Sequence, residues 1–303
     1  MITVFGSINV DLVSRVKSHP RPGETVTGSD YSLIPGGKGA NQALAATRAG
    51  ARVRLVGAIG NDDLADVALT ELRAGGVDLG HVARRDAKTG VAIIIVDAAG
   101  ENSIVVSPGA NKTVTAGQAN DTAFAADDTL LLQLEVPYEE GRKVAERARG
   151  AGARVILSVA PFRPLSAADV ATVSVLVMNE HEAADLATHL GLRAGSDEAN
   201  VVALSKTLGR TVIATLGAEG AVAAGDGKVV RVPALAVTPV DTTGAGDTFA
   251  GVLAAFLDEG ADLRTAMTHA AIAGSLATTK HGAQPSFPTR AEIDEAAAVQ
   301  AKS

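Results

Sequence analysis

The positions of apolar residues along the chain predict a β-sheet whose strands alternate with helices. Continuous apolar runs of strand length are separated by segments in which small or apolar residues recur at helical spacing. Strands that are apolar throughout are typical of a parallel sheet covered by helices on both faces. The predicted strands are Ile2–Phe5, Val53–Ile59, Thr129–Leu134, Val155–Val159, Val173–Met178 and Thr211–Leu216, and the predicted helices are Asn41–Arg48, Leu64–Ala74, Glu139–Arg149 and Glu182–Leu190.

Two regions, residues 11–35 and 90–106, depart from this alternation because no helix separates their strands. They therefore predict a small antiparallel sheet apart from the main one. Such a sheet can close as a lid over a neighbouring site, or the two regions can be surface hairpins with no role in closure. The strand candidates are Leu12–Arg15 and Glu24–Leu33, joined by a proline-rich turn, and the hairpin Val91–Val96 and Ile104–Val106.

Composition limits the classes of protein that this sequence can encode. Apolar residues make up 47% of the 303 residues and aromatic residues only 3%, so the core must consist of Ala, Val, Leu and Ile. No internal repeat or long linker interrupts the chain, and we expect residues 1–303 to form one domain. The net charge of −7, without any basic block, argues against nucleic acid as a partner.

Cysteine content and hydropathy bear on the cellular compartment. The chain has no cysteine, which excludes disulfides, a thiolate nucleophile and a cysteine-ligated zinc site and fits a cytoplasmic location. The chain starts with a strand-like run that has no basic region or long apolar stretch, so no signal peptide is expected. The longest uncharged apolar run near the middle, Val91–Val96, is too short to span a bilayer, and no membrane partner is expected.

The segment Val240–Phe249 has the composition of a phosphate-binding helix start. Apolar residues recur at helical spacing from Phe249 onward, and Gly244, Ala245 and Gly246 precede them. Small residues let backbone N–H groups meet a ligand directly, and a helix N-terminus adds unpaired donors and a partial positive charge. These three residues therefore predict an anion hole for a transferring phosphoryl group.

Asp247 lies in the first turn of this predicted helix, beside the anion hole. A carboxylate in line with a phosphoryl group can accept the proton of an attacking hydroxyl as the new bond forms. The alternative is that Asp247 only caps the helix, as aspartate often does. The chain has neither a P-loop sequence nor Gly-x-Gly-x-x-Gly after its first strand, which argues against a P-loop enzyme and a dinucleotide-binding Rossmann domain.

Six motifs are spread between Gly6 and about Ile293: Gly6–Asp11, Pro22–Gly28, Gly36–Ala43, Gln133–Glu135, Asp241–Phe249 and Lys280–Ser286. Together they resemble one family, the ribokinase or PfkB-type carbohydrate kinases. The resemblance implies a ribokinase-like three-layer α/β/α fold with a mostly parallel central sheet and a small β-sheet lid inserted at about residues 11–35 and 90–106. It also implies transfer of the γ-phosphate of ATP to the 5-hydroxyl of a sugar, with D-ribose as the leading acceptor and Asp247 as the general base.

The resemblance implies a set of residues that hold the sugar. Carboxylates and amides suit a ligand with many hydroxyl groups, because they can accept or donate the hydrogen bonds that hydroxyls make. Considered alone, Asp11 also fits an exposed turn, and Lys38 also fits an ordinary surface charge at a helix start. The implied sugar ligands are Asn9, Asp11, Gly37, Lys38, Gly39, Asn41, Glu135 and Asp247.

The same resemblance implies a nucleotide site with Mg²⁺. Glu182 is expected near the magnesium ion, which it would hold indirectly, because Mg²⁺ prefers oxygen ligands and retains water. Asn179 and Glu182 also match a capping box, and the loop after Thr215 also fits a plain strand-to-hairpin turn. The implied ATP-binding residues are Asn179, Thr215, Gly217, Gly220 and Gly246.

A monovalent cation site and a homodimer are further implications of the resemblance. A bound K⁺ would fix the anion-hole loop and activate the enzyme; alternatively, Asp241 only ties down its own loop. The dimer would form through the lid, where Val91, Ile93 and Ile95 give one apolar face. The implied K⁺ site comprises Asp241, Thr243, Ala277, Lys280, Gly282 and Ser286.

One departure from the family pattern concerns the acceptor. Ser158 and Val159 stand where members of this family typically have Asn-Pro, and the shorter Ser158 leaves the preferred sugar open. A kinase for a nucleoside, deoxyribose or fructose is the first alternative. Few aromatic residues lie near the proposed sugar ligands, which counts against a nucleoside because its base would stack on them. A sugar-binding sensor without turnover is the second alternative, against which the intact Asp247 argues.

Overall fold

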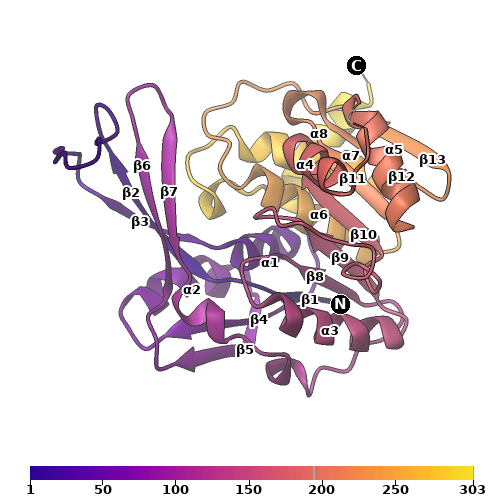
Figure 1. Cartoon of the computed structure of the whole chain (residues 1–303), viewed down its shortest axis with the longest axis horizontal. Helices are drawn as coiled ribbons and strands as arrows, with labels where there is room; N and C mark the ends of the chain where they lie inside the picture. Colours follow the sequence, from indigo (N-terminus) through magenta and orange to yellow (C-terminus); the bar gives the residue numbers. More distant parts are fainter. Residues whose placement is uncertain (194, 303) are drawn as a thin grey trace.

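A nine-stranded sheet forms the centre of the molecule in the computed structural model, which describes residues 1–193 and 195–302 (Figure 1). Its order is β13-β12-β11-β10-β9-β8-β1-β4-β5, and every neighbouring pair from β11 to β5 is parallel. All six predicted strands are present, and the mostly parallel sheet is confirmed. The strands are β1 (Ile2–Phe5), β4 (Val53–Gly60), β5 (Asp78–Arg85), β8 (Thr129–Leu132), β9 (Arg154–Ser158), β10 (Val175–Asn179), β11 (Thr211–Thr215), β12 (Ala221–Gly225) and β13 (Lys228–Val232).

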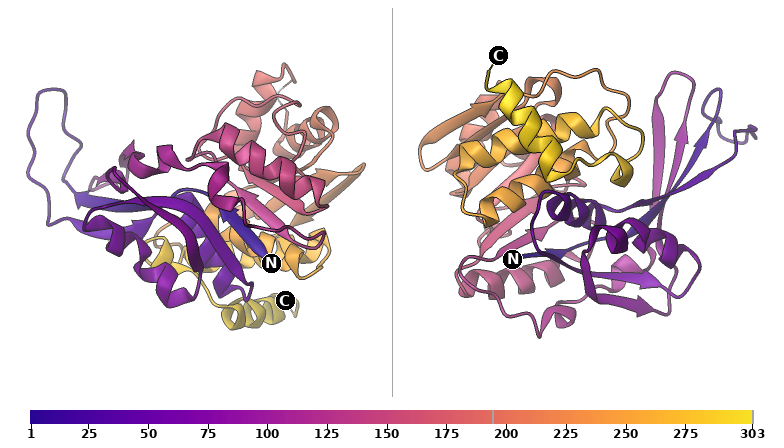
Figure 2. Two further views of the ribbon diagram at one scale, coloured as in Figure 1. Left: turned by 90° about the horizontal axis from the view of Figure 1, so that it is seen from below. Right: turned by 180° about the vertical axis from the view of Figure 1, so that it is seen from behind.

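Helices cover both faces of this sheet, which confirms the three predicted layers (Figure 2). Helices α1, α2, α6, α7 and α8 share one apolar core with Val4, whereas α3, α4 and α5 share the other with Phe5. Because side chains alternate between the two faces of a strand, these neighbouring residues of β1 enter different cores. The helices are α1 (Lys38–Arg48), α2 (Leu64–Gly75), α3 (Tyr138–Gly150), α4 (Glu180–His189), α5 (Asp197–Leu208), α6 (Ala245–Asp258), α7 (Leu263–Ala277) and α8 (Arg290–Gln300), with short 3₁₀ turns at Gly109–Thr113, Ala116–Ala119, Gly217–Glu219 and Gln284–Ser286.

A second sheet of four strands stands beside the main sheet at the place predicted for a lid (Figure 1). Its order is β3-β2-β6-β7, and the β2–β3 and β6–β7 pairs are antiparallel as predicted. The β2–β6 pair is parallel, so the prediction of a purely antiparallel sheet is wrong. The two strands extend from the main sheet in the same direction, which makes their pairing parallel. The strands are β2 (Asn9–Arg15), β3 (Ser32–Gly36), β6 (Gly90–Val96) and β7 (Asn102–Ser107).

The prediction of a strand over Glu24–Leu33 is wrong for most of its length. Only Ser32 and Leu33 belong to β3, which continues to Gly36, and residues 24–31 form no strand. These residues are mostly polar and almost all exposed, so they offer no alternating apolar face to pair against β2.

Helices α1 and α6 approach each other closely, and this contact positions the residues at their N-termini. At Gly251 of α6, an added Cβ would lie 2.5 Å from the backbone oxygen of Gln42 and 2.8 Å from the Cβ of Ala45. Only glycine fits this crossing, which brings the start of α1 against the start of α6. In the described part of the chain, no helix combines the length and the apolar character needed to cross a bilayer.

Candidate active site

The predicted site residues gather where the parallel strands end at their carboxyl termini. The last residues of β9, β10 and β11 (Ser158, Asn179 and Thr215) line one cavity together with Gly244, Gly246 and Asp247 at the start of α6. Ligands of open α/β sheets commonly bind at this edge, outside the carboxyl ends of the strands. A cavity of about 150 Å³ lies here and is lined by Lys38, Ser158, Ala160, Val177, Met178, Asn179, Glu182, Thr215, Gly244, Gly246 and Asp247.

The start of α6 has the open backbone that the sequence predicts. Gly244 has a φ of +79°, and an added Cβ there would lie 2.9 Å from the side chains of Ala283 and Phe287. Gly246 lines the cavity, and an added Cβ there would have no protein atom within 4 Å. The N–H of Ala245 donates to the backbone oxygen of Thr242 at 3.2 Å, whereas those of Gly246 and Asp247 have no partner among the described residues. Unpaired N–H groups at a helix start suit an anion.

The Asp247 carboxylate is held by two amides from α1. Oδ2 accepts a hydrogen bond from Asn41 Nδ2 and Oδ1 accepts one from Gln42 Nε2, both at 2.9 Å. The side chain makes no capping hydrogen bond, and Gly244 is the residue at the N-cap. Asp247 is buried, and it lines the cavity.

Lys38 lies among the carboxylates of the site. The attraction of Asp247 raises the pKa of Lys38, and Glu135, Glu182 and Asp11 add to this effect, although burial acts in the opposite direction. The ammonium group therefore stays charged and offsets the negative charges around it. The backbone N–H of Lys38 also donates to Glu135 at 3.1 Å.

The residues predicted to hold the sugar surround the start of β2. Burial raises the pKa of Asp11 to about 7, and the nearby charges of Glu135 and Asp247 act in the same direction. Asn9 Oδ1 accepts from Asn111 Nδ2 at 2.7 Å, so one face of this amide is already engaged. Gly37 has a φ of +89°, and an added Cβ there would lie 2.7 Å from the backbone nitrogen of Asn9.

Two further sugar candidates have structural contacts that the sequence does not reveal. Asn41 donates to Asp247 and accepts from Gln284 Nε2 at 3.1 Å, so both ends of its amide are occupied. Gly39 packs against the chain after β1, because an added Cβ would lie 2.5 Å from the backbone nitrogen of Ser7. Ser7 in turn donates its hydroxyl to Glu135 at 2.6 Å.

On the nucleotide side, both interpretations of Asn179 and Glu182 fit the structure. The two residues form a capping box at the start of α4, with reciprocal hydrogen bonds of 2.8 Å, and both line the cavity. Burial raises the pKa of Glu182. Thr215 lines the same cavity, whereas Gly217 does not. Gly220 is required for packing, because an added Cβ would lie 2.1 Å from the backbone oxygen of Val232.

The candidate K⁺ residues are only partly brought together. Asp241 accepts from the backbone N–H groups of Thr243 and Gly282, each at 2.9 Å, so its side chain joins two loops. Burial alone would raise the pKa of Asp241, but the hydrogen bonds to the carboxylate outweigh it and lower this pKa. Lys280 pairs with Glu292 at 3.6 Å. Ser286 donates to its own turn, and Ala277 is buried at the end of α7.

A second cavity of about 470 Å³ separates the lid from the body. It is lined by Asp11 and by strand residues of the lid on one side, and by the loops at Asp241–Thr243 and His281–Ala283 on the other. Asp11 faces this cavity, whereas Asp247 lines the smaller one beside the start of α6.

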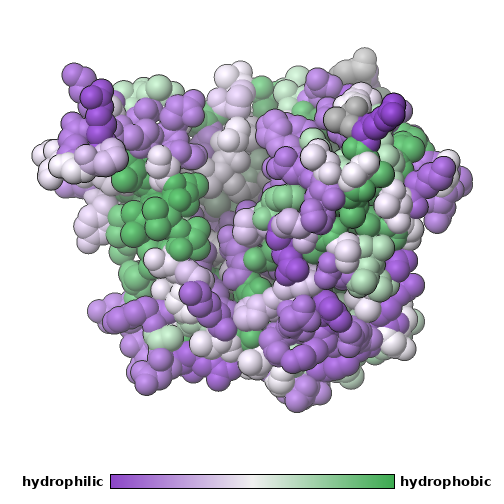
Figure 3. All heavy atoms as spheres, in the orientation of Figure 1, coloured by the Kyte–Doolittle hydropathy of each residue, from purple (hydrophilic) through white to green (hydrophobic). Residues whose placement is uncertain are grey.

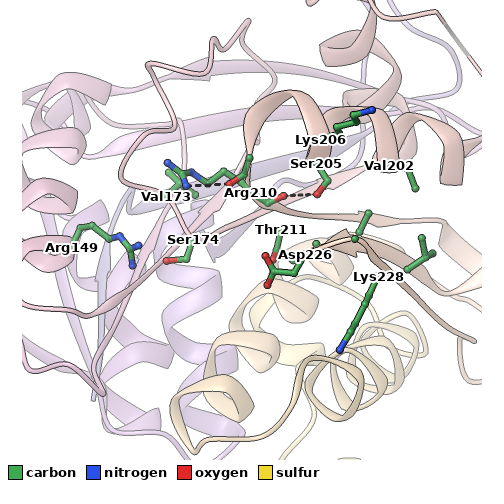
Figure 4. A pocket seen from close by; sticks show the side chains of 15 residues that line it. Arg149, Val173, Ser174, Val202, Ser205, Lys206, Arg210, Thr211, Asp226 and Lys228 are labelled. Carbon is green, nitrogen blue, oxygen red and sulfur yellow. Dashed lines mark hydrogen bonds between the residues drawn. The ribbon is translucent and has the colours of Figure 1, made fainter.

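A larger cavity of about 550 Å³ lies at the opposite edge of the sheet, near the amino ends of β10 and β11 (Figure 4). Arg149, Lys206 and Lys228 line it, but none of the predicted site residues does. The guanidinium group of Arg210 donates to the backbone oxygens of Val170 and Ala171, which leaves it committed to the fold. The predicted site residues that line a cavity therefore lie away from this one.

Several polar residues that support the site have no role predicted from the sequence. The side-chain amide of Asn111 donates to Asn9 Oδ1 and to the backbone oxygen of Ile8, and its oxygen accepts from the backbone N–H of Ile8. Gln42 and Gln133 form a hydrogen-bonded pair behind Asp247, at 2.8 Å. A signal was available for Gln42 and Gln133, because each is a polar residue among apolar or small residues, one position after Asn41 and two positions before Glu135 respectively.

Comparisons with known proteins identify the family of this chain. Residues 1–290 match the family model described as pfkB family carbohydrate kinase. The ribokinase of Bacillus subtilis is 38% identical over 297 residues, covering 97% of this chain and 98% of that protein. The crystal structure of a ribokinase from Thermotoga maritima superposes with a TM-score of 0.91 at 32% identity, covering 98% of this chain and 99% of that one.

A third comparison concerns a structure with ligands. The structure of Arabidopsis thaliana ribokinase complexed with ribose and ATP superposes with a TM-score of 0.87 at 29% identity, covering 97% of each chain. The family match spans nearly the whole chain and includes both the lid and the start of α6. The chain therefore belongs to the pfkB family of carbohydrate kinases.

Proposed function

We propose that this protein is an ATP-dependent kinase that transfers the γ-phosphate to the 5-hydroxyl of D-ribose. The observation that carries the proposal is the placement of Asp247, held by Asn41 and Gln42 beside the glycine-lined start of α6. The relatives named ribokinase, and the Arabidopsis structure with ribose and ATP, support ribose as the acceptor.

The reaction needs three contributions from this chain. Asp247 accepts the proton of the 5-hydroxyl as the oxygen–phosphorus bond forms and the bond to ADP breaks. The N–H groups at the start of α6 bind the oxygens of the phosphoryl group as it is transferred. These oxygens carry the negative charge in the transition state. Lys38 supplies a positive charge between the carboxylates and the phosphates.

The sugar is held by polar groups around β2 and the start of α1. Among the described residues, the Asp11 carboxylate accepts no side-chain or backbone hydrogen bond, so it is open to sugar hydroxyls. Glu135 is positioned by Ser7 and by the backbone of Lys38. Asn9, Gly37, Gly39 and Asn41 complete the proposed site, the glycines through their backbone.

The nucleotide would lie along the ends of β10 and β11, beside Asn179, Thr215, Gly217, Gly220 and Gly246. No cluster of three or more His, Cys, Asp or Glu side chains able to hold a metal occurs in the described part of the chain. The oxygen donors Glu182 and Asn179 fit a Mg²⁺ that is bound mainly by phosphates and water. When bound, this ion neutralises charge on the phosphates.

The ionisation of Asp11 predicts how sugar binding depends on pH. With a pKa of about 7, Asp11 is mostly protonated at pH 6 and mostly ionised at pH 8. If the carboxylate accepts from sugar hydroxyls, KM for ribose falls as pH rises, by about 10-fold across this range. Steady-state kinetics at saturating ATP check this, and Asp11→Asn should abolish the pH dependence; a flat wild-type profile would disprove it.

We further propose that K⁺ activates the enzyme at the loops joined by Asp241. The carboxylate links the anion-hole loop to the segment at Gly282, and a large cation beside it would hold both. Turnover should rise with K⁺ and less with Na⁺, and Asp241→Ala should remove the difference. The same rate in K⁺, Na⁺ and a buffer without either ion would exclude this site.

The lid supports the proposal of a homodimer. Figure 3 shows a green, apolar patch over the lid. Ile93 of β6 and Val105 of β7 are paired across the two strands, are 41% and 62% exposed, and lie on the face of the lid opposite to Ile94 and Ile104, which line the cavity. Sedimentation should show a dimer in the wild type and a monomer for Val105→Lys, because a buried unpaired charge is costly. A monomeric wild type would refute the dimer.

We also propose a cytoplasmic location, which the absence of cysteine favours.

One assay tests the proposed acceptor. ADP release is measured with ribose, 2-deoxyribose, fructose and adenosine under identical conditions, and ribose should give the highest kcat/KM. A higher kcat/KM for another compound would show that this compound, and not ribose, is the acceptor. The comparison is informative because the short side chain of Ser158 lines the cavity. Sugar binding without any ADP release would instead indicate a sensor.

A further inference from the structure

A row of buried amides runs behind Asp247. Gln284 donates to Asn41, Asn41 and Gln42 both donate to Asp247, and Gln133 donates to Gln42, with distances of 2.8–3.1 Å. Gln42 and Gln284 are fully buried, and Gln133 is 3% exposed. The row reaches Asp247 from helix α1, from the residue after β8 and from the turn before α8.

The charge on Asp247 fixes the direction of every bond in this row. An ionised carboxylate only accepts hydrogen bonds, so both neighbouring amides must turn their NH₂ groups toward it. Gln42 is then left with its oxygen facing Gln133, which must donate in turn. The orientation of each amide therefore follows from the ionised state of a general base.

Gln42 is separate from the surfaces that touch ligands. It is absent from the lining of both the cavity at Asp247 and the cavity under the lid. The close crossing at Gly251 presses its backbone against α6, which leaves the side chain little freedom. Asn41, the other described donor to Asp247, is a proposed sugar ligand, so of these two donors Gln42 is the one without a proposed role in binding.

We infer that Gln42 is a positioning residue for Asp247, itself oriented by Gln133. The two amides fix the rotation of the carboxylate, and the remaining lone pairs face the cavity where the acceptor hydroxyl lies. Without Gln42, the carboxylate keeps one donor and can rotate away from the hydroxyl. This inference rests on the proposed function, because it assigns a role relative to the general base.

The test replaces Gln42 by methionine, which has a similar volume and no donor. Loss of a hydrogen bond to a charged group predicts a fall in kcat of roughly 10–100-fold, with KM for ribose and ATP changed less than about 2-fold. The matched control is Asn200→Leu, which removes a buried amide from α5, far from the site, and should leave kcat unchanged.

A double variant separates positioning from a purely structural role. If Gln42 acts only through the base, Gln42→Met should cause no further loss of kcat in an Asp247→Asn enzyme. The inference is overturned if Gln42→Met lowers kcat of the Asp247→Asn enzyme by the same factor as it lowers kcat of the wild type. It is also overturned if Gln42→Met alone leaves kcat unchanged. If Asp247→Asn alone keeps full activity, the proposed function fails instead, so the two failures are distinguishable.

A second variant covers the case in which Gln42→Met does not fold. Gln133→Met leaves Gln42 in place but removes the donor that orients it, and we expect a kcat loss of about 3–10-fold with unchanged KM values. Thermal unfolding of each variant establishes that the measured protein is folded. An unchanged kcat for folded Gln133→Met would overturn the part assigned to Gln133.

Discussion

Replacing Asp247 by asparagine is expected to lower kcat by about 10²–10⁴-fold, the range for loss of a general base. Asparagine has nearly the same shape but cannot take the proton of the sugar hydroxyl as the phosphoryl group arrives. Binding of ribose and ATP should change little, because the cavity keeps its form. ADP release gives kcat, and calorimetric titration gives the two dissociation constants.

A matched control separates catalysis from a general effect at a helix start. Asp262 caps α7 by accepting from the backbone N–H of Thr265 at 2.8 Å, and it is remote from the cavity. Asp262→Asn should therefore keep wild-type kcat. Wild-type turnover by folded Asp247→Asn would remove the base from the mechanism.

The second large effect is expected from Gly246→Ala. The added methyl group meets no protein atom within 4 Å, so the fold should persist. It would enter the cavity in which the γ-phosphate is proposed to bind, and it would keep phosphate oxygens from the N–H groups at the start of α6. Removing one donor of an oxyanion hole typically costs 10²–10³-fold in kcat, and we expect a loss of about that size.

Gly150 supplies the control for this substitution. It ends α3, and an added Cβ there also meets no atom within 4 Å. Gly150→Ala should keep full activity, so a loss confined to Gly246→Ala would reflect the site and not the change of residue type. Equal kcat/KM for ATP in the Gly246→Ala enzyme and the wild type would place the phosphate elsewhere.

Much of the main sheet could be predicted because its strands are apolar on both faces. β1 is buried at all four positions, and its bounds agree with the prediction. The edge strand β5 was not predicted, because only one of its sides is paired and most of its residues are partly or fully exposed. The parallel β2–β6 pair could not be predicted either, since it joins residues about 80 positions apart.

The chemistry of the site was easier to predict than its supports. The glycines at the start of α6 and Asp247 lie in one continuous segment, so local reasoning finds them. Gln42, Gln133 and Gln284 come from three separate segments and meet only after folding. Asn41 also donates a hydrogen bond to Asp247, and this contact likewise joins two helices that are far apart in the sequence.

The most direct test of the account is a crystal structure with ribose and a non-hydrolysable ATP analogue. We predict that the 5-hydroxyl lies within about 2.6–3.2 Å of an Asp247 carboxylate oxygen. The terminal phosphate should lie on the N–H groups at the start of α6, with Asp11 on the sugar hydroxyls. A ribose bound elsewhere, or an Asp247 carboxylate without contact to it, would contradict the account.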